Sequence, residues 1–118
     1  MTGEIDPTVV EHWKRWDLTE FLEKNWSTVG PKVNGKIHVY VGEHDNYFLD
    51  GAVHMMDARV QKLSNPAPDI AFTYGPTGNH GWSPWTKPQL YRVMADHIAK
   101  NAPAGTDTSG WIGTPPKK

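Results

Sequence analysis

The segment Lys36–Leu63, KIHVYVGEHDNYFLDGAVHMMDARVQKL, decides the fold that we expect for this chain. In its first part, apolar β-branched residues alternate with His38 and Tyr40, a pattern typical of a mostly covered strand that ends at Gly42. Further along, apolar residues recur at helical spacing, and these are Leu49, Val53, Met56, Val60 and Leu63. The segment therefore predicts a buried strand, a loop that carries Asp45, and an amphipathic helix.

A second strand is predicted at Ile70–Tyr74, after a connection at Ser64–Asp69 that contains two prolines. Two strands joined by a helix form a βαβ unit, and such a connection requires parallel pairing. The predicted class is therefore α/β. Because two strands alone leave sheet edges unpaired, we expect them to belong to a larger α/β sheet.

Helices are predicted on both sides of this unit. Asp6-Pro7 is a typical helix start, and Asp17–Glu20 has the spacing of a capping box for a short helix that buries Phe21, Leu22 and Trp26. Residues 29–35 contain Gly, Pro and Asn and are predicted to form a turn. A last helix is predicted to begin at Thr86–Gln89 and to end near Pro103. We thus expect one domain over residues 1–103 and a flexible tail over residues 104–118.

Composition excludes several classes of function. Twelve basic and thirteen acidic side chains give a net charge of −1, so neither nucleic acid nor an acidic membrane surface is an expected partner. The chain has no cysteine, which excludes disulfides, thiolate nucleophiles and cysteine-ligated metals. No apolar run approaches the roughly 20 residues of a membrane span. We predict no cofactor and no metal, and the composition indicates no particular compartment.

Asp45 and His80 are the candidate catalytic residues. Asp45 follows the first predicted strand, and His80 lies in the loop GPTGNHGWSPW after the second. The carboxyl ends of parallel strands share one edge of a sheet, so the two side chains are expected to meet there. A carboxylate that binds one imidazole nitrogen fixes the tautomer and leaves the other nitrogen free to accept a proton.

Residues 13–97, and above all KIHVYVGEHDNYFL followed by FTYGPTGNHGWSPW, resemble the C-terminal part of the esterase branch of the α/β-hydrolase family. The resemblance implies a partial α/β-hydrolase-like fold in which Asp45 is the triad acid and His80 the base. The family's Gly-x-Ser-x-Gly nucleophile elbow has no counterpart in this sequence. We therefore expect a truncated or partial ester hydrolase, inactive without a serine from an additional N-terminal segment or an oligomer partner, which would also complete the sheet.

Other interpretations of the same residues remain open. Asp45 is also a typical helix cap, and an exposed role is the simplest one for His54. Trp82 and Trp85 are candidate substrate-binding residues, although aromatic residues after a turn also pin loops to a core. An alternative function is a non-catalytic, Trp-rich carbohydrate- or peptide-binding module, for which Trp111 would join Trp82 and Trp85. A metal site made from His44, Asp45 and His80 is a third hypothesis.

Overall fold

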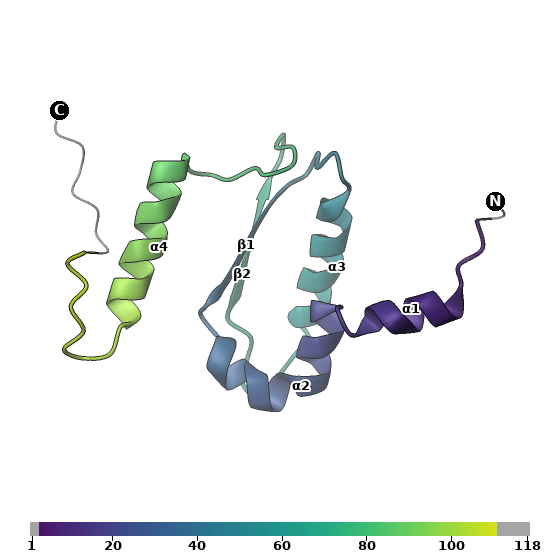
Figure 1. The fold of residues 1–118 in the computed structure, drawn as a ribbon, viewed down its shortest axis with the longest axis horizontal. Coiled ribbons are helices and arrows are strands. Elements are labelled where there is room, and N and C mark those ends of the chain that lie inside the picture. Colours follow the sequence, from purple (N-terminus) through teal and green to yellow (C-terminus); the bar gives the residue numbers. More distant parts are fainter. Residues whose placement is uncertain (1–2, 111–118) are drawn as a thin grey trace. The chain divides into compact units, whose positions relative to one another are not determined.

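The computed structural model describes residues 3–110 of the chain (Figure 1). Its elements are, in chain order, α1 (Pro7–Lys14), α2 (Leu18–Val33), β1 (Ile37–Gly42), α3 (Leu49–Val60), β2 (Ile70–Gly75) and α4 (Lys87–Asn101). These elements form two compact units, one up to Trp82 and one from Ser83 onward.

The first unit is built around a parallel pair of strands. Ile37 of β1 lies opposite Ile70 of β2, and Gly42 lies opposite Gly75 at the other end. α3 connects the two strands, so the predicted βαβ unit with parallel pairing is confirmed. Within residues 3–110 the sheet consists of these two strands, which places the described chain in the mixed α/β class.

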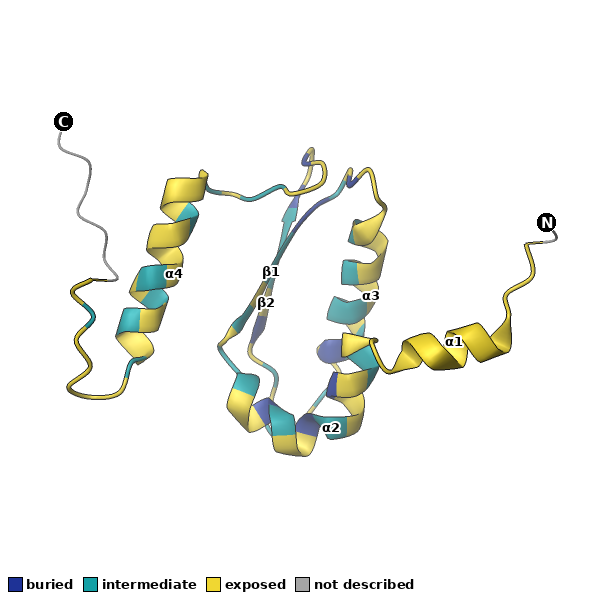
Figure 2. Cartoon of the chain, viewed as in Figure 1, coloured by how far each residue is buried: buried dark blue, intermediate teal, exposed yellow. Residues whose placement is uncertain are grey.

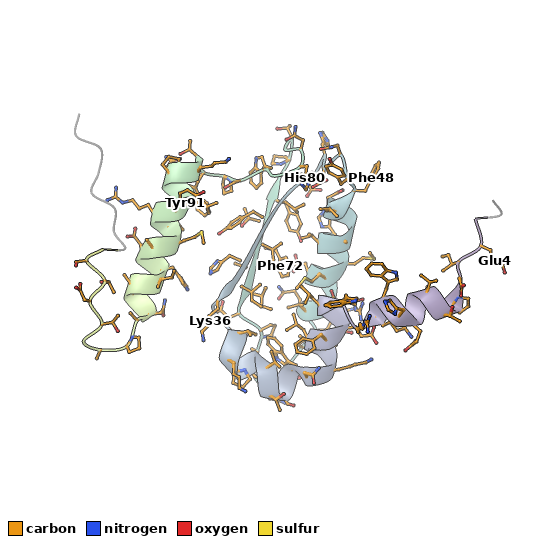
Figure 3. The ribbon with its side chains drawn as sticks, in the orientation of Figure 1. Glu4, Lys36, Phe48, Phe72, His80 and Tyr91 are labelled. Carbon is orange, nitrogen blue, oxygen red and sulfur yellow. The ribbon has the colours of Figure 1, made fainter. Side chains whose placement is uncertain are left out.

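A small apolar core fastens α2 and α3 to one face of the sheet. Its buried residues are Leu22 and Trp26 from α2, Val60 from α3, and Ile70 from β2. Met56 and Phe72 pack against them, and Phe72 is labelled in Figure 3. Of the apolar residues predicted at helical spacing, Met56, Val60 and Leu63 pack on this face, whereas Leu49 is exposed.

The predicted turn at residues 29–35 is confirmed only for residues 34–35 and is wrong for residues 29–33, since α2 continues through Gly30 and Pro31 to Val33. Its end is held by hydrogen bonds to the connection before β2. The Asn34 side chain donates to the Ala67 carbonyl at 2.8 Å and accepts from the Asp69 N–H at 3.1 Å. These distant partners stabilise the last turn of the helix, and local turn propensity does not contain them.

The predicted helix starts are confirmed. Asp6 and Asp17 cap α1 and α2, and the Asp17 carboxylate accepts hydrogen bonds from the N–H groups of Thr19 and Glu20. The expectation that Phe21 is buried is wrong, because its side chain is 48% exposed. Trp13 and Trp16 are exposed as well. α1 contributes no buried residue, so its apolar side chains lie outside the core (Figure 2).

The second unit contains α4 and the segment after it. Gln89 Oε1 accepts a hydrogen bond from the Thr86 N–H at 2.9 Å, as the capping-box spacing predicts. α4 ends at Asn101, before Pro103, as expected. Part of the predicted tail, including Trp111, lies outside the described residues. None of the helices in residues 3–110 is long and apolar enough to cross a membrane.

Candidate active site

Two loops leave the same end of the sheet and are joined by backbone hydrogen bonds. After β1, the Glu43 N–H donates to the Gly75 carbonyl, and the His44 N–H donates to the Gly78 carbonyl, each at 2.9 Å. The backbones approach so closely that a Cβ atom at Gly42 would lie 2.1 Å from Gly78 O. The loop after β1 and the loop after β2 are therefore held in one fixed register.

This register brings Asp45 and His80 together. His80 Nδ1 lies 3.0 Å from Asp45 Oδ2. An ionised carboxylate can only accept, so Nδ1 is the donor and Nε2 is the nitrogen able to accept a proton. The Asp45 side chain is 3% exposed and that of His80 is 49% exposed, so a buried acid supports a base that solvent reaches. Figure 3 shows His80 at the end of the sheet opposite Lys36.

Asp45 is also held from its own loop, because Oδ1 accepts a hydrogen bond from the Tyr47 N–H at 2.7 Å. It is not the cap residue of α3. That position belongs to Phe48, which has φ 60° and gives no side-chain cap bond. Burial by itself raises the pKa of the Asp45 carboxyl. This pKa is nevertheless held below its ordinary value by hydrogen bonds from the Tyr47 N–H and the His80 ring, by the charge of His80, and by the Leu49 N–H.

The lowered pKa of Asp45 predicts an acid-dependent contribution to stability. The folded state binds the Asp45 proton less tightly than the unfolded state, so this contribution is present above the ordinary value of 3.8 and is lost as pH falls through the lower folded-state pKa. In urea unfolding, Asp45→Asn should therefore be less stable than the parent near pH 7, and the difference should shrink below about pH 4. A difference that stays constant down to about pH 2 would contradict this account.

The tryptophans proposed for substrate binding have different surroundings. Trp82 is half-buried, and its ring packs against the backbone of Gly75 and Gly78, where an added Cβ would lie 2.3 Å from ring atoms. The ring thus supports the loop that carries His80. Trp85 lies in the second unit. Substrate binding by Trp82 and Trp85 stays a prediction.

A second acid–histidine pair lies nearby and is missed by the sequence interpretation. His54 Nε2, on α3, is 3.0 Å from Glu43 Oε2, and the His54 ring stacks on Tyr74 with centroids 4.3 Å apart. Tyr74 Oη donates to Asp57 Oδ2 at 2.8 Å. Burial and the Asp57 carboxylate raise the pKa of Tyr74 well above its usual value. His54 is exposed, as expected of a surface residue, and in addition it pairs with Glu43 and stacks on Tyr74.

The metal hypothesis receives no geometric support from the described residues. Across residues 3–110, no three His, Asp or Glu side chains are arranged to hold a metal ion. His44 is exposed, and its backbone N–H donates to the Gly78 carbonyl.

Comparisons of the chain with protein-family models, with curated proteins and with solved structures gave no match. The interpretation of the site therefore depends on its own geometry. What this geometry can perform is proton transfer, because an oriented imidazole presents one nitrogen to solvent and a buried carboxylate stabilises the imidazolium.

Proposed function

We propose that this chain supplies the acid and the base of a serine-type carboxylic ester hydrolase, within an α/β-hydrolase-like fold. His80 acts as general base and Asp45 orients it. The single observation that carries the proposal is the 3.0 Å contact between His80 Nδ1 and Asp45 Oδ2 at the carboxyl ends of two parallel strands. In open α/β sheets this edge is where ligands bind and chemistry takes place.

In the proposed reaction, His80 Nε2 takes the proton of a serine hydroxyl while the serine oxygen attacks the ester carbonyl carbon. The imidazolium then gives this proton to the departing alkoxide, which leaves as an alcohol. Water attacks the acyl-serine in the second half, with His80 again accepting and returning a proton. The sum is ester plus water giving carboxylic acid plus alcohol, and Asp45 stabilises the imidazolium in each half.

The serine is proposed to come from a polypeptide segment outside this sequence, because no Gly-x-Ser-x-Gly motif occurs within it. Such a segment, or a second subunit, would also add strands beside β1 and β2. Sheets of two strands are rarely stable alone, and this supports the proposal that the sheet is extended by a partner.

The proposal is tested by the reaction of the intact chain with p-nitrophenyl acetate, an activated ester that imidazole attacks directly. Nε2 attacks the carbonyl carbon, p-nitrophenolate leaves, and water then hydrolyses the acetyl-imidazole. The rate due to His80 is the nitrophenolate release of the parent minus that of His80→Gln. We expect Asp45→Asn to lower this rate roughly tenfold, the effect of one charge-assisted hydrogen bond.

His54 provides a matched internal control. Its ring is also 49% exposed and also lies 3.0 Å from a carboxylate, but Glu43 is 33% exposed and is not enclosed as Asp45 is. The rate due to His54, obtained from His54→Gln, should be lower than the rate due to His80. Equal rates at the two histidines, or no effect of Asp45→Asn, would exclude His80 as an activated base.

A further inference from the structure

Three consecutive residues of the loop after β1 contact His80. Asp45 binds the ring through Nδ1, and Asn46 Oδ1 accepts a hydrogen bond from the His80 backbone N–H at 3.4 Å. Tyr47 places its ring edge-on to the imidazole, with centroids 4.7 Å apart and an interplanar angle of 72°. The loop after β1 therefore holds both the backbone and the ring of His80.

One hydrogen bond does not fix the plane of an imidazole ring, since the ring can turn about the line that joins Nδ1 to the carboxylate. His80 is half exposed and precedes Gly81, which has φ +75°. A second contact to the ring is thus needed to set the direction of Nε2. The distance and angle between the Tyr47 and His80 rings lie in the favourable range for edge-to-face aromatic pairs.

We propose that the Tyr47 side chain is a positioning residue that fixes the plane of the His80 ring and so aims Nε2. This inference rests on the proposed function, in which Nε2 accepts the proton. It assigns Tyr47 a role that acts through His80.

The two contributions of Tyr47 can be separated by substitution. Its hydrogen bond to Asp45 Oδ1 comes from the backbone N–H, which every residue except proline retains. The side chain is exposed, so its removal leaves no cavity in the core. Tyr47→Ala therefore removes the ring contact while the Asp45 bond remains, and Tyr47→Phe keeps the ring and removes only the hydroxyl.

We would measure the order parameter of the His80 ring by NMR relaxation, together with the rate of p-nitrophenyl acetate cleavage due to His80. Tyr47→Ala should lower the ring order parameter and reduce this rate about threefold to tenfold, as expected for loss of one aromatic pair. Tyr47→Phe should match the parent. Tyr91→Ala is the control, because Tyr91 is as exposed as Tyr47, at 66% against 65%, and lies in the other unit.

Each other outcome overturns the inference in a distinguishable way. If Asp45→Asn slows the reaction at His80 and Tyr47→Ala does not, the positioning role is wrong and the proposed function stands. If neither variant has an effect, the proposed function fails as well. If Tyr47→Phe lowered the rate as much as Tyr47→Ala, the effect would belong to the hydroxyl group. If Tyr47→Ala changed the amide chemical shifts throughout the first unit, the effect would belong to the fold.

Discussion

Trp26→Ala is expected to lower the free energy of unfolding by about 3–5 kcal/mol, the range for truncating a buried aromatic residue. Trp26 is 4% exposed and packs in the core with Leu22, Val60 and Ile70. Its Nε1 also donates to the Pro66 carbonyl at 2.8 Å, which ties α2 to the connection that leads into β2. The free energy of unfolding of a native domain is about 5–15 kcal/mol, so this one substitution removes a large share of it.

Urea unfolding followed by circular dichroism checks this prediction. Trp26→Phe keeps most of the apolar contact and loses the hydrogen bond, so its effect should be intermediate. Trp13→Ala is the matched control, because Trp13 is 63% exposed on α1, and its effect should stay within about 0.5 kcal/mol. If Trp13→Ala and Trp26→Ala were equally destabilising, the core would not lie where the structure places it.

The sequence predicted the elements whose signals are local. Asp17 and the Thr86–Gln89 capping box predicted helix starts, and alternation of apolar residues predicted β1. The end of α2 could not be predicted in this way, because hydrogen bonds from Asn34 to residues more than 30 positions away outweigh the turn propensity of Gly30 and Pro31. The exposure of Phe21 was missed for a similar reason, since helical spacing does not show whether a partner covers that side of the helix.

The pairing of Asp45 with His80 was predictable from topology, because both follow strands that run parallel. The contacts of Tyr47 were not predictable in this way, although its place two residues after Asp45 was a usable signal. The left-handed conformation of Phe48 could not be expected either, since bulky residues seldom adopt positive φ. Phe48 is the N-cap residue of α3 and lies three positions after Asp45.

Gly42 is constrained by a part of the chain that is distant in sequence. A glycine at the end of a strand suggests a turn, yet the glycines with positive φ in residues 3–110 are Gly3, Gly35, Gly81 and Gly105. Gly42 is required because the backbone of the other loop passes beside it, with a Cβ position 2.1 Å from Gly78 O and 2.6 Å from Asn79 O. Gly78 and Asn79 follow Gly42 by 36 and 37 positions in the sequence, so the constraint comes from the tertiary structure.

Gly42→Ala is therefore expected to push the two loops apart. Overpacking of this kind costs about 1–3 kcal/mol of unfolding free energy, and the contact at Gly42 is with backbone, which has little room to move. The hydrogen bond from the His44 N–H to the Gly78 carbonyl lies beside this contact, so the register that joins Asp45 to His80 should be lost with it. We expect the reaction of His80 with p-nitrophenyl acetate to fall to the level of His54.

Gly51→Ala is the matched control, because Gly51 lies in α3 and a Cβ there would meet nothing within 4 Å. Alanine favours the helix over glycine, so this variant should gain about 0.5–1 kcal/mol and keep the reactivity of His80. The same change from glycine to alanine would then have opposite effects on stability at the two positions, and only Gly42→Ala would disturb the site. If Gly42→Ala instead left both stability and His80 unchanged, the two loops would not be in contact, and the pairing of Asp45 with His80 would lose its structural basis.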